Sequence, residues 1–123
     1  MIKIKQKDIR LLREQYYLEQ NGLCAICHEL VQPEEAVLDH DHKTGYLRAV
    51  LHRGCNAYIG HMENNLARNR ITPSRLDMIL ANFKNYVAST KPILHPTHKT
   101  PEERLARAKK RAKARRAKKL QIG

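Results

Sequence analysis

Apolar side chains recur along the 123-residue chain in patterns that predict both helices and strands. Over residues 8–20, Ile9, Leu12 and Tyr16 recur at three- to four-residue spacing, which is typical of an amphipathic helix. Asn21-Gly22 should end this helix, because both residues favour turns. The first predicted element is therefore a single helix.

Between residues 36 and 51 the pattern changes to that of a β-hairpin. Residues 37–40 read as one strand, 43–45 as a Gly-containing turn and 46–51 as the return strand, since β-branched and aromatic residues flank the turn. A helix is predicted to follow over about residues 55–66, with apolar side chains along one side. A hairpin followed directly by a helix forms a ββα unit.

A second amphipathic helix is predicted over residues 73–88. Residues 64–72 are polar and read as a connection, and Pro73 suits the first turn of a helix. The apolar stripe has i, i+3, i+4, i+7 and i+11 spacing, so it could pack into the core of the same chain or form a homodimer interface. The stripe consists of Leu76, Ile79, Leu80, Phe83 and Val87.

The last third of the chain has little apolar character. Residues 91–101 contain three prolines and predict a connector without regular structure. Residues 102–120 carry ten Lys and Arg against two Glu, which predicts either a DNA-binding tail that becomes helical on DNA or a solvated tail. The candidate DNA contacts there are Arg107, Lys110, Arg111 and Arg115.

Charge and composition narrow the class of partner. With 24 Lys and Arg against 12 Asp and Glu, the formal net charge is +12, which favours a polyanionic partner such as nucleic acid. No apolar run approaches the roughly 18 residues of a membrane-spanning helix, and the first residues do not resemble a secretory signal. We expect a cytoplasmic protein without a membrane partner, located in the host cytoplasm if a phage encodes it.

Four residues have the spacing of a structural zinc site. Cys24 and Cys27 form one pair with two residues between them, and His52 and Cys55 form another. A chain with one Phe and no Trp can bury only a small core, so a structural metal ion is physically reasonable. Three cysteines suit a disulfide framework poorly, and the remaining alternative is that they are ordinary buried thiols.

A second set of polar residues lies between these pairs and suits phosphodiester hydrolysis. A neutral imidazole can take a proton from water, and His40 is a candidate for this general base. Asp39 and Asn56 supply the oxygen ligands that a hard divalent cation prefers. Because adjacent strand residues point to opposite faces, Asp39 and His40 need a local bulge to serve one site, or they act from different sides of the backbone.

The central stretch resembles a known family. The run Leu38-Asp-His-Asp-His-Lys-Thr-Gly45, with Arg48 and His52-x-x-Cys-Asn56, is similar to the phage recombination endonuclease VII family, a branch of the HNH or His-Me finger nucleases. The resemblance covers about residues 15–63. It implies four zinc ligands around a ββα active site, magnesium or manganese on Asp39 and Asn56, and His40 as general base. It further implies dimers that cut branched DNA to 5′-phosphate and 3′-hydroxyl ends.

This sequence departs from the family pattern at three positions. His52 stands where the family usually has Cys, and this exchange keeps a competent zinc ligand. Ala49 follows Arg48 where the family has Gly. Ile59 stands where some members carry a catalytic acid three residues after the Asn, and Glu63 is the nearest acid downstream.

Several neighbouring residues have two interpretations. His42 could contact the phosphate, orient His40 or lie on the hairpin surface, and Asp41 is expected to point outward. Arg48 and Lys43 are expected to face the DNA backbone. His61 shows no ligand spacing and reads as structural or solvated.

Together these features predict an α+β protein with a small zinc-stabilised ββα core, flanking helices and a basic tail. The expected function is a metal-dependent DNA endonuclease acting on branched or duplex DNA. The alternative is a zinc-stabilised DNA-binding module without catalysis, and an RNA-binding protein is a weaker third, because the hairpin lacks an aromatic stacking platform. The expected segments are an N-terminal helix at 1–22, the nuclease core at 23–66, the amphipathic helix at 67–90, the connector at 91–101 and the basic tail at 102–123.

Overall fold

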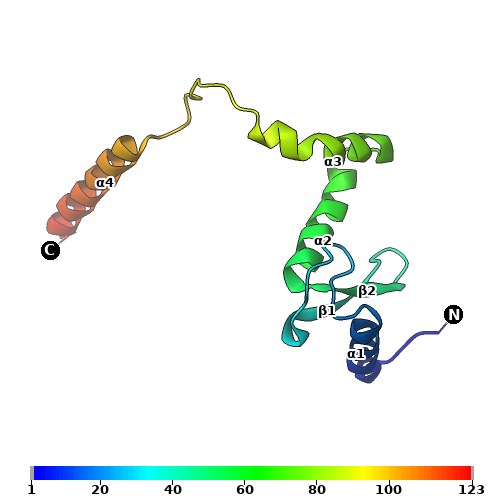
Figure 1. Ribbon diagram of the computed structural model, residues 1–123. Helices are drawn as coiled ribbons and strands as arrows, with labels where there is room; N and C mark the ends of the chain where they lie inside the picture. Colours follow the sequence, from blue (N-terminus) through cyan, green and yellow to red (C-terminus); the bar gives the residue numbers. More distant parts are fainter. Residues whose placement is uncertain (1, 123) are drawn as a thin grey trace. The chain divides into compact units, whose positions relative to one another are not determined.

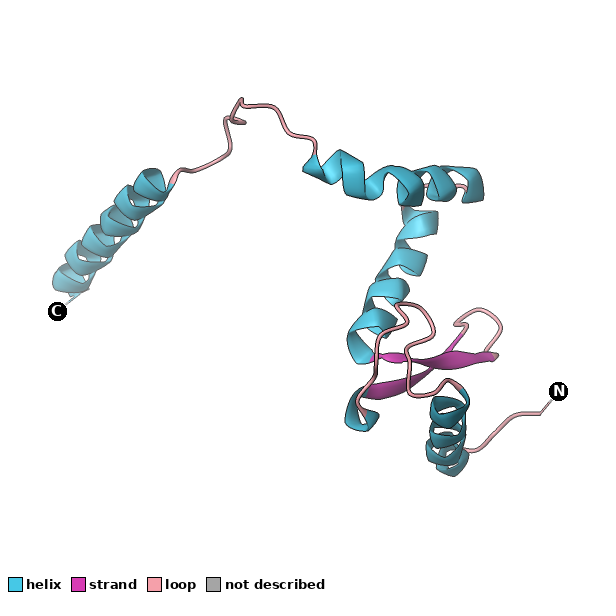
Figure 2. Cartoon of the chain, viewed as in Figure 1, coloured by secondary structure: helices cyan, strands magenta, loops and turns pink. Residues whose placement is uncertain are grey.

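The computed structural model describes residues 2–122 and has an α+β fold, as predicted (Figures 1 and 2). Its described part contains four α-helices, two short 3-10 helices and one antiparallel sheet of two strands. In chain order the elements are η1 (Gln6–Asp8), α1 (Ile9–Glu19), η2 (Pro33–Glu35), β1 (Ala36–His40), β2 (Leu47–His52), α2 (Arg53–Arg68), α3 (Pro73–Ala88) and α4 (Pro101–Ile122).

The chain divides into two units, one ending at Ala81 and one beginning at Asn82, and each is described by itself. In the first unit, α1 and α2 both contact the β1–β2 hairpin. Five apolar residues of the described chain are buried in this core, with the partly buried Tyr16, Tyr17, Leu38, Cys55 and Ile59 packed against them. A core this small gives little hydrophobic stabilisation. The buried five are Cys24, Val31, Ala36, Val50 and Leu51.

The side chain of Gln20 joins the end of α1 to the hairpin. Its Nε2 donates to the carbonyl oxygens of Leu23 at 2.8 Å and Val50 at 2.9 Å, and its Oε1 accepts from the Val50 N–H at 2.8 Å. The helix ends at the predicted place, since Asn21 and Gly22 both have positive φ angles. This turn directs the chain towards the first Cys pair.

The hairpin contains a bulge, one of the two alternatives that the sequence left open, but its extra residue lies in β2 and not in β1, where it would bring Asp39 and His40 to one side. Leu38 pairs with Val50 and His40 pairs with Leu47, so one residue of β1, Asp39, lies opposite two residues of β2. The two are Arg48 and Ala49, and neither has a positive φ angle. Alanine is therefore compatible with this bulge, at the position where the family has glycine.

The prediction for α2 was correct in type but too short. The helix runs from Arg53 to Arg68, so the expected polar connection over residues 64–72 is wrong for its first half. Ala67 and Arg68 are strong helix formers and extend the helix by about half a turn beyond its predicted end. Only residues 69–72 connect α2 to α3, which begins at Pro73 as predicted.

The interpretation of the 73–88 stripe as core of the same chain is wrong for the described residues. No residue of α3 is buried, and Leu80, Phe83 and Val87 are each more than half exposed. The core of the first unit is formed by α1, α2, the hairpin and the loop that carries Cys24 and Val31, and no residue of α3 belongs to it. The apolar stripe is left on the surface of the single chain.

The predicted basic tail forms the helix α4, and its contact with DNA stays a prediction. The Thr100 Oγ1 accepts from the Glu103 N–H at 3.2 Å, which caps the helix, and Glu102 and Glu103 lie in its first turn. Alanine, lysine and arginine then favour the helix along its length. No regular element lies between α3 and α4, as predicted for the connector.

None of the helices within residues 2–122 combines the length and the apolar character that crossing a bilayer requires.

Candidate functional site

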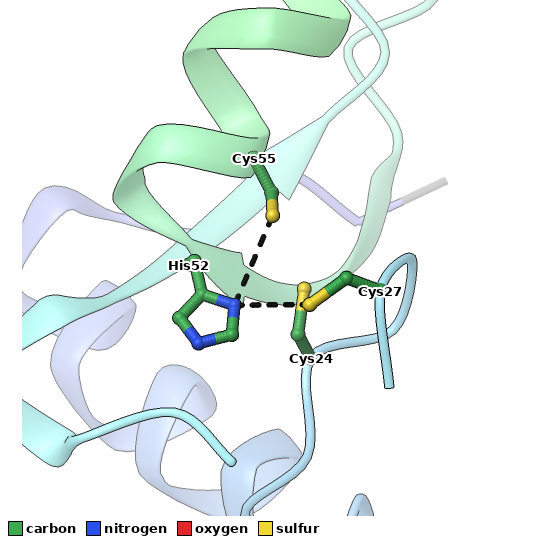
Figure 3. Close-up of side chains that lie close together, drawn as sticks. All are labelled: Cys24, Cys27, His52 and Cys55. Atoms are coloured by element: carbon green, nitrogen blue, oxygen red, sulfur yellow. Dashed lines mark hydrogen bonds between the residues drawn. The ribbon is translucent and has the colours of Figure 1, made fainter. Parts of the chain in front are cut away.

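The two predicted ligand pairs come together beside the hairpin (Figure 3). Cys24 and Cys27 lie in the loop between α1 and β1, His52 ends β2, and Cys55 lies in the first turn of α2. Their ligand atoms all lie within 4.8 Å of one another. Tetrahedral zinc with bonds of about 2.0–2.3 Å requires ligand separations of about 3.5–3.8 Å, so a single ion fits with small adjustments.

The loop carrying the first pair is shaped by its backbone. The His28 N–H donates to the Cys24 carbonyl at 2.9 Å, and the Cys24 N–H donates to the Glu29 carbonyl at 2.9 Å. His28 adopts a positive φ of 63°, which closes this tight turn. Cys24 and Cys27 are thereby presented on one side of the turn, the arrangement that two intervening residues predict.

The electrostatics of the cluster favour a bound cation. Burial tends to raise the pKa of Cys24, but N–H groups of the backbone, led by that of Cys27, outweigh it and lower this pKa to about 6. Burial and the neighbouring thiols raise the pKa of Cys55 to about 11. A divalent cation would allow all three sulfurs to lose their protons, because it neutralises the negative charge they gather.

His52 is oriented as a ligand through Nδ1. This atom lies 3.3 Å from the Cys27 Sγ and 3.8 Å from the Cys55 Sγ, whereas Nε2 is 2.9 Å from the Leu30 carbonyl oxygen. A carbonyl oxygen accepts a hydrogen bond only from a nitrogen that carries a proton, so this contact places the proton on Nε2. The unprotonated Nδ1 is then free to bind the metal. The exchange of Cys for His at this position is therefore compatible with a zinc site. The alternative that the cysteines are ordinary buried thiols does not explain why all four ligand atoms lie together.

A cavity of about 230 Å³ lies between the hairpin and α2. Asp39 and Asn56, the two predicted ligands for a catalytic cation, both line it. Asn56 directly follows Cys55, so the Cys3His cluster determines where this amide is held. The remaining lining residues are His42, Arg48, Ala57, Gly60, His61, Glu63 and Asn64.

His40 does not line this cavity, although it is the predicted general base. Its exposed ring stacks on that of His42, with centroids 4.7 Å apart and planes 8° from parallel. His42 does line the cavity. His40 is therefore separated from the cavity by the His42 ring, and its own ring is exposed to solvent.

Asp39 is buried and Arg48 balances its charge. The Arg48 Nε donates to the Asp39 Oδ2 at 2.6 Å, and its two terminal nitrogens donate to Glu63 at 2.9 and 3.1 Å. Glu63 and then Asp39 raise the pKa of Arg48, and Arg48 lowers the pKa of Glu63. The guanidinium of Arg48 is therefore paired with two carboxylates, and its contact with the DNA backbone stays a prediction.

Two cavity residues were missed or undervalued from the sequence. Glu63 was noted only as the nearest downstream acid, and His61 as structural or solvated, yet both line the cavity. The available signal for Glu63 was helical spacing, because it follows Asn56 by seven residues and so lies on the same face of α2. His61 follows Asn56 by five residues, so this spacing does not indicate it. Ile59 lies outside the cavity lining and packs against the core.

The remaining predicted residues lie on the surface. Asp41 closes the hairpin turn, where its Oδ1 accepts from the N–H groups of Lys43 at 2.7 Å and Thr44 at 3.1 Å; these bonds, that from Thr44 first, lower its pKa. Lys43 is exposed at this turn. The four candidates in the basic segment, Arg107, Lys110, Arg111 and Arg115, are all exposed on α4.

One comparison with known proteins bears on these features. The family model described as recombination endonuclease VII matches residues 3–79 of the chain, which is more than half its length and includes every residue of the cluster and the cavity.

Proposed function

The chain belongs to the recombination endonuclease VII family, and we propose on this basis that it hydrolyses DNA by an HNH-type, metal-dependent mechanism. Membership makes it an endonuclease, a hydrolase with DNA as substrate. The proposed details are a structural zinc ion on the Cys3His cluster and a catalytic magnesium or manganese ion on Asp39 and Asn56.

The observation that carries the proposal is the shared cavity. A carboxylate on β1 and an amide on α2 meet there, and both are hard oxygen donors of the type that magnesium prefers. The metal cluster lies immediately beside the amide in the chain, through the Cys55–Asn56 peptide bond. A module that only binds DNA has no use for this arrangement.

Each residue then has a distinct part in the reaction. Asp39 and Asn56 would hold a divalent cation, which would supply positive charge to neutralise the scissile phosphate and the leaving group. His40 takes the proton of the attacking water. His42 contacts the phosphate and keeps the His40 ring in place by stacking. Attack of water on phosphorus breaks the bond to the 3′ oxygen and leaves 5′-phosphate and 3′-hydroxyl ends.

The proposed substrate is branched DNA, such as a four-way junction, with nicking of duplex DNA as the second possibility. Symmetric cutting of a junction requires two active sites, and therefore a homodimer. The exposed apolar stripe of the 73–88 helix supports this, because pairing two copies would cover it. Three reduced cysteines around a metal suit the cytoplasm, where thiols persist.

The test is cleavage by the purified, zinc-loaded full chain. A synthetic four-way junction, a linear duplex of matched sequence and supercoiled plasmid are incubated with magnesium, manganese or EDTA. We expect cutting with either metal and none with EDTA, and we expect Asn56→Ala to remove cutting while zinc content and melting temperature stay unchanged. Zinc-loaded protein that binds all three DNAs but cuts none with either metal would support the non-catalytic module instead.

A further inference from the structure

The cavity proposed to hold a divalent cation already contains a fixed positive charge. Arg48 enters from the bulge of β2 and pairs with Asp39 through Nε and with Glu63 through both terminal nitrogens. Glu63 lies two turns along α2 from Asn56, on the same helix face. The guanidinium is thus held from two sides, by a carboxylate on the hairpin and by a carboxylate on the helix.

This double pairing limits how much of Asp39 the guanidinium can occupy. An arginine facing a single carboxylate tends to bind it with two parallel hydrogen bonds, which engage both oxygens. Here the fork of terminal nitrogens is turned towards Glu63, and only Nε reaches Asp39, at Oδ2. The second oxygen, Oδ1, is therefore left as a ligand.

We propose that Glu63 is a positioning residue that holds Arg48 turned away from Asp39, so that one oxygen of Asp39 stays available to the divalent cation. The proposal rests on the proposed function, because it assumes a cation on Asp39 and Asn56. It gives Glu63 a role different from that of the acid missing at Ile59, since Glu63 acts through Arg48. Without Glu63, the guanidinium would turn onto both oxygens of Asp39 and compete with the metal.

The test measures Mn²⁺ binding to zinc-loaded protein in the absence of DNA, from the electron paramagnetic resonance signal of free Mn²⁺. Glu63→Gln, Arg48→Gln and the double variant are compared with wild type. We expect about tenfold weaker binding for Glu63→Gln, corresponding to about 1.4 kcal/mol of competition by Arg48. We expect Arg48→Gln to bind at least as tightly as wild type, and Glu63→Gln to have less than a twofold effect in that background.

Two further variants separate restraint from charge. Glu14→Gln removes an acid that pairs with Arg10 at 3.2 Å on α1, away from the cavity, and is expected to leave Mn²⁺ binding unchanged. Glu63→Asp keeps the charge but shortens the reach to Arg48, and is expected to weaken binding nearly as much as Glu63→Gln. Glu63 and Arg48 are both partly exposed, so melting curves should show that the variants stay folded.

The outcomes are distinct. Equal weakening by Glu63→Gln in the wild-type and Arg48→Gln backgrounds would mean that Glu63 acts by its own charge, and would overturn the proposal while leaving the metal site intact. A wild type that binds no Mn²⁺ would overturn the metal site of the proposed function and this proposal with it.

A separate observation concerns α4, on which four of the five arginines share one face. Four arginines follow one another at spacings of three, four and four residues, which at 100° per residue places them within an arc of about 80°. They extend over about 16 Å of helix. Lys109 and Lys113 lie on the opposite side together with Arg116, Lys110 lies nearer the edge of the arc, and Lys118 falls within it. The arginine face consists of Arg104, Arg107, Arg111 and Arg115.

We infer that the arginine face is the surface of α4 that contacts the phosphates of duplex DNA, with the opposite lysines left in solvent. Planar guanidinium groups bind phosphate oxygens in pairs, whereas an ammonium group acts as a point charge. The helix offers no apolar face for a protein partner, since Leu105 and Leu120 are both exposed and stand alone. This inference deepens the proposed function by assigning DNA contact to one face.

Matched charge removal tests the assignment in the full chain. Arg104, Arg107 and Arg111 are replaced by Gln in one variant, and Lys109, Lys110 and Lys113 in another, so each loses three positive charges. For the arginine variant we expect at least tenfold weaker binding to a labelled duplex, and a log–log salt slope shallower by about 2.7 for three lost phosphate contacts. We expect less than half of either change for the lysine variant.

Fluorescence anisotropy across a salt series gives both quantities, and circular dichroism shows whether helix content is kept. Equal losses in the two variants would mean that α4 binds as a diffuse positive charge, which would overturn the assignment. Cleavage of the junction at low salt should persist in both variants, so a failed assignment does not count against the nuclease itself.

Discussion

Chelation of zinc from the Cys3His cluster is expected to unfold the hairpin and the start of α2. The reason is that the described core contains five buried apolar residues, one of which, Cys24, is itself a proposed ligand. Structural zinc contributes about 10–16 kcal/mol of apparent binding free energy in small zinc domains, which is comparable to the roughly 5–15 kcal/mol that stabilises a typical fold. Circular dichroism and thermal melting before and after chelation, with zinc counted per chain, measure the effect.

Cys27→Ser is the sharpest single substitution at this cluster. Cys27 is exposed, so the change opens no cavity, and a loss of stability would report the lost ligand. We expect loss of zinc and a fall in the free energy of unfolding of several kcal/mol. The matched control is Ile26→Ala, one residue away in the same turn and 55% exposed, for which we expect less than about 1 kcal/mol. An unchanged melting temperature after chelation, or in Cys27→Ser, would show that the ion does not support the fold.

The parts of this fold that could be predicted from sequence are those with short-range causes. The two-residue spacing of each ligand pair corresponds to one tight turn, and Asn21-Gly22 ends α1 because these residues accept positive φ angles. The hairpin and the helix after it follow from a change of apolar period. The adjacency of Asp39 and His40 left two alternatives open, a bulge or action from different sides of the backbone, and only Asp39 lines the cavity.

The parts that could not be predicted depend on contacts between elements. Which of the two strands carries the extra residue of the bulge depends on pairing across the hairpin. The position of the bulge in turn determines where Arg48 points. The Arg48–Glu63 pair joins residues 15 positions apart, which no local pattern specifies. The exposure of α3 depends on which helices pack against the hairpin, and these are α1 and α2. By contrast, the cap of α4 has a local sequence signal, a Thr at position 100 followed three residues later by a Glu at position 103.

His40→Ala is expected to lower the rate of DNA cleavage by about 10²- to 10⁴-fold, the contribution typical of a general base. Both His40 and His42 lie near the cavity, and their rings are stacked, so proximity alone does not separate them. His40 is proposed as the base because it directly follows Asp39, the position at which the resemblance to the family places the general base, whereas both rings are exposed. Single-turnover cleavage of a four-way junction at saturating magnesium measures the chemical step.

His42→Ala is the matched comparison, since it removes the same kind of side chain two residues away. We expect a smaller loss, of about tenfold, because phosphate contact and ring stacking support the reaction without transferring the proton. Zinc content and melting temperature should match wild type in both variants, because neither residue touches the Cys3His cluster. If His42→Ala abolishes cleavage and His40→Ala leaves it near wild type, the proton is taken by the imidazole that lines the cavity, and the roles of the two stacked rings are exchanged.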